Sequence, residues 1–97
     1  MTAAGAAAAE GAIARLRRNI DEIDDVLVKL LNQRAKWALE IGLVKKAAGI
    51  AIYQPDREAE VLAHAARANR GPLAPAAVQR LFERIVDESR TLERTAE

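Results

Sequence analysis

The chain has 97 residues, which suggests a single domain, and its formal net charge of +1 provides no overall basic field for binding nucleic acid. It has no cysteine, which excludes disulfides and thiol chemistry. No apolar run reaches the length of about 18 residues that a membrane span needs, so we expect a cytoplasmic protein. About half of the residues are apolar, but many of these are alanine, so a lone chain would have a thin core and oligomerisation is favoured.

Residues 1–12 form a low-complexity segment, MTAAGAAAAEGA. They lack the basic start and the strongly apolar stretch of a signal peptide. Alanine favours helix, but a short terminal segment frays easily. We therefore expect a disordered Ala-rich tail here and a folded domain over residues 13–97.

Residues 13–49 carry the pattern that organises the chain. No proline interrupts them, and their apolar residues follow the i, i+3, i+4, i+7 spacing of an amphipathic helix. The apolar positions are Ile13, Leu16, Ile20, Ile23, Leu27, Leu30, Leu31, Ala38 and Ile41. This helix would be about 55 Å long, whereas a compact chain of this size has a diameter of roughly 30–35 Å. The apolar stripe would stay wet in a monomer, so we expect an antiparallel second copy to cover it.

Two shorter helices should follow the long one. Pro55 suits the first turn of a second helix, which ends near residues 69–71. Pro75 suits the first turn of a third helix, which runs to about Glu93. Strand signals are essentially absent. The sequence therefore predicts an all-α chain of three helices with a very long first helix.

Each predicted helix places polar side chains on the stripe that should be apolar. They are Arg17 (at the edge of its stripe), Arg34 and Lys45 from the first helix, Glu58 from the second, and Ser89 and Glu93 from the third. Any one of them could be a stray charge whose stem is buried while its head reaches water. An uncompensated buried charge is costly, however, and bundle interiors are where helical proteins build ligand sites. Together these residues predict a polar pocket whose cations favour a small dicarboxylate.

Other kinds of site have little support in the sequence. His64 is the only histidine and has no Cys or His partner at ligand spacing, so we expect no metal. The basic run at residues 15–18 is followed at once by acidic residues. No helix-turn-helix or Gly-rich phosphate loop is present, so nucleic-acid binding is not expected.

Five motifs follow one another along the chain. They are Leu16-Arg17-x-x-Ile20-Asp21-x-Ile23-Asp24, Leu30-Leu31-x-x-Arg34, Ile41-Gly42-x-x-Lys45, Tyr53-x-Pro55-x-Arg57-Glu58 and Phe82-x-x-Ile85-x-x-Glu88-Ser89. The ordered set, with these spacings, resembles the all-helical class of chorismate mutases over residues 13–95.

This resemblance implies an isomerase that rearranges chorismate to prephenate, the step of the shikimate pathway that commits carbon to phenylalanine and tyrosine. It implies an intertwined helical-bundle homodimer in which the long first helices span both protomers. Each active site would then borrow one arginine, here Arg17, from the other chain. The reaction is an intramolecular Claisen rearrangement, so the resemblance implies no nucleophile, general base, metal or cofactor.

The resemblance also implies roles for the pocket residues. Arg17 and Arg34 would clamp the two carboxylates of chorismate, with Ser89 assisting. Lys45 and Glu93 would contact the ether oxygen, where negative charge develops as the C–O bond breaks.

At the other end of the substrate, Glu58 would accept a hydrogen bond from the ring hydroxyl, and Arg57 would orient Glu58 or the carboxylates. Two substrate-binding positions depart from the residues that are usual in the family. Many members have Asp where this chain has Gln54, and bacterial members often have Gln where this chain has Glu93. An ionised carboxylate can only accept hydrogen bonds, as the ether oxygen does, so we expect the neutral form of Glu93 to be the active one.

Two other functions stay open at this point. A lyase of the same fold, which removes pyruvate from isochorismate, would share the pocket cations. A non-catalytic helical dimer that binds a small dianion would need neither Arg34 nor Lys45 for its function. The sequence carries no signal for catalytic rate, feedback control or a complex with another shikimate-pathway enzyme.

Overall fold

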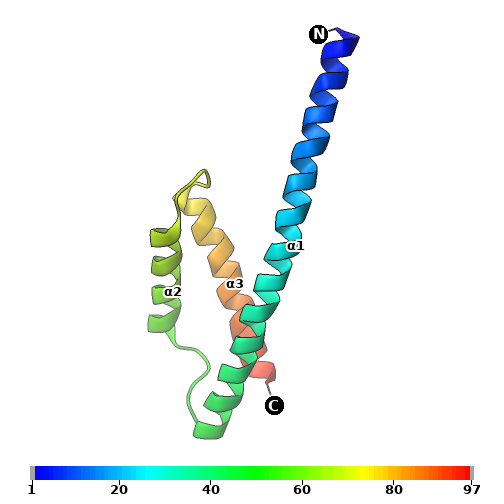
Figure 1. Cartoon of the computed structure of the whole chain (residues 1–97). Coiled ribbons are helices and arrows are strands. Elements are labelled where there is room, and N and C mark those ends of the chain that lie inside the picture. Colours follow the sequence, from blue (N-terminus) through cyan, green and yellow to red (C-terminus); the bar gives the residue numbers. More distant parts are fainter. Residues whose placement is uncertain (1, 97) are drawn as a thin grey trace. The chain divides into compact units, whose positions relative to one another are not determined.

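The computed structural model describes residues 2–96 and has three α-helices, α1 (Ala3–Ala48), α2 (Pro55–Ala68) and α3 (Pro75–Thr95) (Figure 1). The described residues contain no β-strand. The prediction of an all-α chain with a very long first helix is therefore confirmed, as are the predicted starts of the two later helices. Among the described residues, no helix has the length and apolarity to cross a lipid bilayer.

The chain divides after Arg34 into two compact parts, and the first consists of the N-terminal portion of α1. The sequence predicts a disordered tail over residues 1–12, but α1 already begins at Ala3. Thr2 caps this helix, because its Oγ1 accepts a hydrogen bond from the amide of Gly5 at 3.0 Å. Alanine has the highest helix propensity, so a capped Ala-rich segment prolongs a helix that the following turns already nucleate. The domain boundary at residue 13 stays a prediction.

The apolar stripe of this first part is exposed in the single chain. Ile20 and Ile23 are 58% and 65% exposed. The other exposed apolar residues of the stripe are Ile13, Leu16, Leu27, Leu30 and Leu31. Contiguous exposed apolar surface of this kind is typical of interaction sites. A chain on its own therefore leaves this stripe in water.

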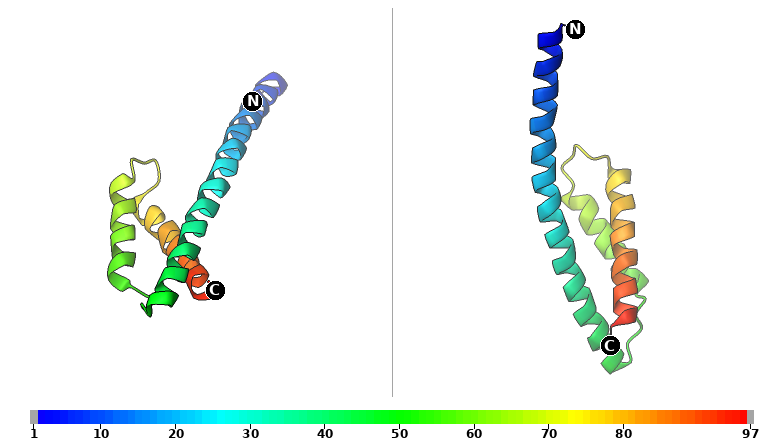
Figure 2. Two further views of the ribbon diagram at one scale, coloured as in Figure 1. Left: turned by 60° about the horizontal axis from the view of Figure 1, so that its bottom comes forward. Right: turned by 90° about the vertical axis from the view of Figure 1, so that its right-hand side faces the viewer.

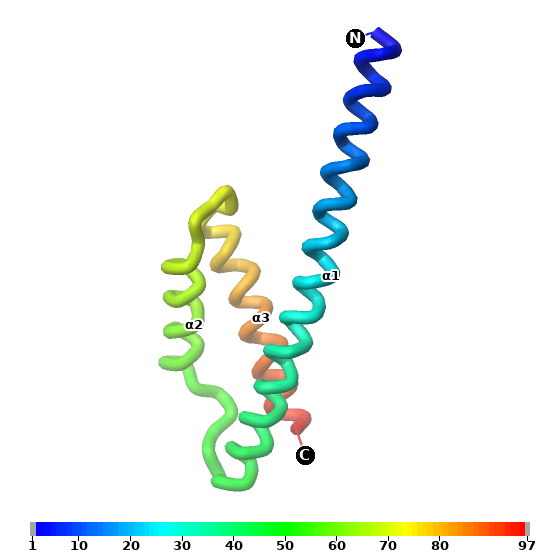
Figure 3. Tube along the Cα trace, viewed as in Figure 1, coloured from blue at the N-terminus to red at the C-terminus, as the bar shows by residue number. Residues whose placement is uncertain are grey.

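α1 ends at Ala48, and Gly49 terminates it. Its φ of 69° lies in the left-handed region, which glycine adopts without strain. The amide of Ile50 donates to the carbonyl of Lys45 at 2.9 Å and closes the last turn. A short connection then leads into α2 (Figure 3). The backbone around Lys45 is thus fixed on both sides, by the helix before it and by this closing bond after it.

The second part begins at Ala35 and holds the C-terminal portion of α1 together with α2 and α3. α2 and α3 lie side by side (Figure 2). The buried apolar side chains are small: Ala38, Ala65, Val78, Val86 and Ala96. No large side chain among the described residues is fully buried. The core of a lone chain is therefore thin, as the composition predicts.

Gly42 lies where α1 meets the end of α3. A Cβ at this position would lie 2.6 Å from the carbonyl oxygen of Glu93, 2.7 Å from the Cα of Glu93 and 2.9 Å from the Cβ of Ala96. Carbon atoms in good contact are about 3.5–4.0 Å apart, so there is no room for even a methyl group. Glycine at this position therefore lets the two backbones approach, one helical turn before Lys45.

We expect Gly42→Ala to destabilise the protein by about 1–3 kcal/mol, because the new methyl group overlaps the backbone of α3. Gly11→Ala is the matched control, since Gly11 lies in the same helix and a Cβ there has nothing within 4 Å. Replacing glycine by alanine in an open helical position stabilises by about 0.5–1 kcal/mol. Thermal unfolding followed by circular dichroism should give a lower Tm for the first variant only; equal Tm values for both would contradict the close contact.

Candidate active site

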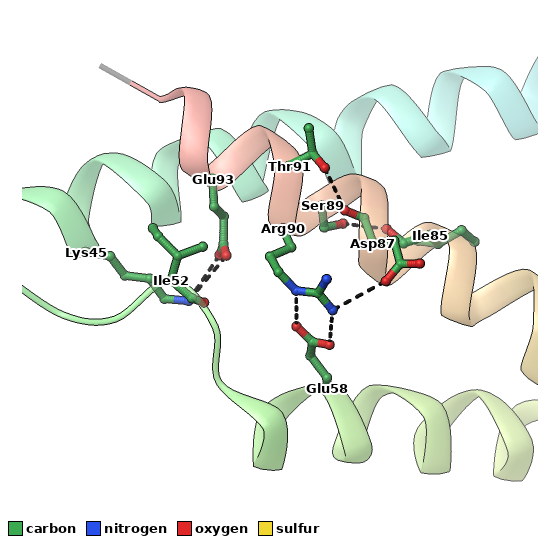
Figure 4. A network of polar contacts seen from close by, with 9 residues as sticks. All are labelled: Lys45, Ile52, Glu58, Ile85, Asp87, Ser89, Arg90, Thr91 and Glu93. Atoms are coloured by element: carbon green, nitrogen blue, oxygen red, sulfur yellow. Dashed lines mark hydrogen bonds and ion pairs between the residues drawn. The ribbon is translucent and has the colours of Figure 1, made fainter.

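Lys45 and Glu93 form an ion pair between α1 and α3 (Figure 4). The Lys45 Nζ donates to the Glu93 Oε1 at 3.3 Å and Oε2 at 3.4 Å, and to the carbonyl oxygen of Ile52 at 3.0 Å. The two side chains are only 12% and 13% exposed. The ammonium group is thus held in place by an anion and by a backbone carbonyl on the connection between α1 and α2.

Glu58 and Arg90 form a second pair, which joins α2 to α3 (Figure 4). The Arg90 Nε donates to the Glu58 Oε2 at 2.8 Å, and the Nη2 donates to the Oε1 at 2.5 Å. Each side chain is 23% exposed. The contact is the bidentate form of an arginine–carboxylate pair, which fixes orientation as well as distance.

Arg90 has two further neighbours. Its Nη2 lies 3.4 Å from the Oδ1 of Asp87, one turn earlier on α3. Its guanidinium carbon lies 5.1 Å from the centre of the Tyr53 ring, a cation–π distance. The guanidinium is therefore held by groups from α2, from α3 and from the connection that precedes α2.

This arrangement shifts the protonation equilibrium of Glu58. The hydrogen bonds from Arg90 lower the pKa of the Glu58 carboxyl; burial opposes them, and the charges of Arg90, Arg94 and Lys45 lower it further. The same pair raises the pKa of Arg90. Glu58 is therefore a carboxylate, and a hydrogen-bond acceptor only, at neutral pH.

Ser89 lies on α3 next to Arg90 and is half-buried. Its hydroxyl donates to the carbonyl oxygen of Ile85 at 3.0 Å, one turn back along the helix. Of the residues that the sequence proposes for the site, Lys45, Glu58, Ser89 and Glu93 are all partly or largely buried in the second part of the chain.

The other proposed residues are Arg57, Gln54, Arg17 and Arg34. Arg57 is exposed and pairs with Glu60 at 3.2 Å, and Gln54 is exposed at the start of α2. Arg17 and Arg34 belong to the first part of the chain, where Arg17 is exposed and Arg34 is half-buried. The substrate contacts of all four stay predictions.

Arg90 is the residue of this cluster that the motif pattern misses. A periodicity signal for it exists, because Arg90 follows Val86 by four residues and Val86 follows Phe82 by four. It therefore lies on the stripe that α3 turns inward, and an inward cation requires a carboxylate partner.

The cluster offers fixed cationic donors and a fixed carboxylate acceptor. They come from the end of α1, the start of α2 and the last turns of α3. Such groups can bind and orient a polar anion and can stabilise charge that develops during a reaction. Among residues 2–96 no group of three or more His, Cys, Asp or Glu stands close enough together to hold a metal ion.

Residues 16–94 match the family model described as chorismate mutase type II. Among solved structures, chorismate mutase (form II) from Thermus thermophilus is 32% identical in sequence and has a TM-score of 0.84, covering 88% of this chain and 97% of that chain.

Two curated relatives are similar to this chain in sequence. The bifunctional chorismate mutase/prephenate dehydratase of Neisseria gonorrhoeae is 41% identical over 78 residues, which are 80% of this chain and 21% of the relative. A 4-amino-4-deoxychorismate mutase of Streptomyces pristinaespiralis is 36% identical over 93 residues, which are 94% of this chain and 71% of that protein. The chain spans about a fifth of the length of the bifunctional relatives that it matches.

The lowered pKa of Glu58 predicts a component of acid sensitivity. The pair with Arg90 stabilises the folded state above the unfolded-state pKa, near the ordinary value of 4.5, and this stabilisation is lost as the pH falls through the lower folded-state pKa. Urea unfolding at a fixed protein concentration should show a steeper acid loss of stability for the parent protein than for Glu58→Gln. Glu60→Gln, which removes an exposed ion pair, is the control; parallel pH curves for the parent and Glu58→Gln would contradict the prediction.

Proposed function

We propose, from the premise that this chain belongs to the chorismate mutase type II family, that it rearranges chorismate to prephenate. The observation that carries the proposal is the largely buried side chain of Lys45, whose ammonium group is held in place by Glu93 and by the carbonyl oxygen of Ile52. A donor that is already fixed can stabilise developing charge without reorganising during the reaction.

The proposed reaction is intramolecular. The C–O bond of the enolpyruvyl ether breaks while a C–C bond forms, and no atom is gained or lost. The protein has to hold a compact conformer and to stabilise the negative charge that grows on the ether oxygen. Lys45 donates to that oxygen in this proposal. Glu93 accepts a hydrogen bond from Lys45 and, in its neutral form, donates to the ether oxygen as well.

The other residues bind the two ends of the dianion. Glu58 accepts a hydrogen bond from the ring hydroxyl, which agrees with its ionised state, and Gln54 lies at the start of the same helix. Ser89 and Arg34 bind carboxylate, and Arg57 turns inward when substrate is present.

The active form in this proposal is a cytoplasmic homodimer. A second copy covers the exposed apolar stripe of α1 and supplies its own Arg17 to the site. An isologous pair has two such sites, because each chain both lends and receives the arginine.

A second substrate is favoured by one comparison. The relative from Streptomyces pristinaespiralis, described as a 4-amino-4-deoxychorismate mutase, matches nearly the whole of this chain. Its substrate differs from chorismate in carrying an amino group in place of the ring hydroxyl, and Glu58 would accept a hydrogen bond from either group.

The direct test is incubation with chorismate, followed by detection of prephenate, with isochorismate and the 4-amino analogue in parallel. Lys45→Ala should lower kcat by about 10²–10³, because one donor to a developing oxyanion contributes about 3–4 kcal/mol. Lys46→Ala, on the exposed neighbouring residue, should keep kcat. Pyruvate release from isochorismate without prephenate formation would replace the proposal by the lyase, and turnover of none of the three would refute catalysis.

The shared site predicts complementation between two inactive variants. Arg17→Ala and Arg34→Ala dimers should each be nearly inactive, because each lacks one carboxylate clamp. After subunit exchange at equal amounts, about half of the dimers are mixed and one of their two sites is complete, so about a quarter of the parental activity should return. Prephenate formation measures the recovery and native mass spectrometry counts the mixed dimers. No recovery in proven mixed dimers would show that Arg17 acts within its own chain.

Replacement of Glu93 tests its part in the reaction. The side chain of Glu93→Gln can still accept a hydrogen bond from Lys45 through its carbonyl oxygen, and its amide group can donate to the ether oxygen. This variant should therefore keep or gain activity near neutral pH and show a flatter pH–rate profile than the parent. Glu93→Leu, which removes both functions, should lose activity. A large loss in Glu93→Gln at every pH would show that Lys45 requires the carboxylate as a counter-ion.

A further inference from the structure

Arg90 donates hydrogen bonds to both carboxylate oxygens of Glu58, but the proposed reaction gives it no role. A carboxylate offers about four acceptor positions, and a bidentate arginine takes one on each oxygen. Arg90 therefore leaves Glu58 free to accept a further hydrogen bond while it fixes the direction in which that bond must come.

The guanidinium is itself well fixed. It contacts Glu58 through Nε at 2.8 Å, it lies 3.4 Å from the Oδ1 of Asp87, and it stacks over the ring of Tyr53 at 5.1 Å. A planar group with neighbours on its edge and on its face has little freedom to rotate. Glu58 is thus bound to a rigid partner and not to a flexible cation such as lysine.

We propose that Arg90 is a positioning residue of the active site, which orients Glu58 toward the substituent on ring carbon 4 of the substrate and favours a neutral hydroxyl there over a charged amine. This inference rests on the proposed function, because it is Glu58 of the proposed site on which Arg90 acts. Arg90 itself contacts no reacting atom.

The charges around Glu58 support this role. Arg90 and Arg94 approach from α3 and Lys45 approaches from α1, and the hydrogen bonds from Arg90 are the largest influence that lowers the pKa of Glu58. Asp87 and Tyr53 face Arg90, while Glu93 faces Lys45. Without Arg90 the carboxylate would keep only the weaker influences of Arg94 and Lys45, so the pKa of Glu58 would rise and the acceptor would be lost at a higher pH.

The same charge bears on substrate choice. An amine on ring carbon 4 is protonated at neutral pH, and its ammonium would meet a carboxylate whose charge is already balanced by a guanidinium. A neutral hydroxyl needs only a free lone pair on the Glu58 carboxylate, to which it donates a hydrogen bond. Removing Arg90 leaves an unbalanced negative charge at Glu58, which attracts an ammonium. The ratio of kcat/KM for the 4-amino substrate to that for chorismate should then rise by about tenfold.

The experiment compares Arg90→Gln and Arg90→Lys with Arg84→Gln, a control that removes an exposed ion pair with Glu88 on the same helix. Each variant is assayed with chorismate and with 4-amino-4-deoxychorismate from about pH 4 to pH 8, after circular dichroism has shown that it is folded. Arg90→Gln should lower kcat/KM for chorismate about tenfold or more and move the acid limb of the profile to higher pH. Arg90→Lys should restore the acid limb through its charge, but not the full rate, because lysine lacks the planar fork. Arg84→Gln should behave as the parent.

An Arg90→Gln protein with the parental pH profile and the parental substrate ratio would overturn the inference, whatever its overall rate. Titration of the Glu58 carboxyl by ¹³C NMR separates this result from a failure of the proposed function. If the parent converts neither substrate, the proposed function fails. The titration then decides the link between the two residues: a Glu58 midpoint that does not rise in Arg90→Gln overturns it, and a raised midpoint supports it.

Discussion

The close approach of α1 to the end of α3 at Gly42 is the constraint on which the charged centre of this chain depends. No side chain separates the two backbones there, so Glu93 lies against the turn of α1 that leads to Lys45. The Nζ of Lys45 and the Oε1 of Glu93 are 3.3 Å apart in the ion pair that joins the two helices at this place. Because Gly42 has no side chain, α1 and α3 approach closely, and this approach determines where Glu93 holds the ammonium group of Lys45.

The pair of Glu58 and Arg90 connects α2 to α3, as the pair of Lys45 and Glu93 connects α1 to α3. Both pairs are partly accessible to water, and ion pairs of this kind contribute little to the free energy of folding. Their geometry is more informative than their strength, since both oxygens of Glu58 and the ammonium of Lys45 are held in defined directions. We interpret both pairs as means of orientation, which suits a proposed reaction that requires placement of charge and no covalent chemistry.

The fold could be predicted because its determinants are local: apolar periodicity, prolines at two helix starts and a glycine at a helix end. The family assignment from ordered motifs is confirmed as well. Periodicity also marks Lys45, Glu58 and Glu93 as inward, but it names no partner, so the contact with Arg90 requires the relative placement of α2 and α3. The helical start at Ala3 was not predicted, because alanine propensity and terminal fraying act in opposite directions in a short Ala-rich segment. The proposed role of Arg17 depends on a second chain; the apolar stripe predicts that such a chain covers α1, but it does not predict where the arginine of that chain would lie.

The scarcity of buried side chains has a consequence for how this protein persists at low concentration. Only small residues are buried among those that the structure describes, and the apolar stripe of α1 remains in water. Ordering each residue costs roughly 1–2 kcal/mol of conformational entropy, and a thin core recovers little of that. In the proposed dimer, most of the missing burial comes from the partner. Folding and association then become one equilibrium, so that stability rises with the logarithm of protein concentration and dilution itself acts as a denaturant.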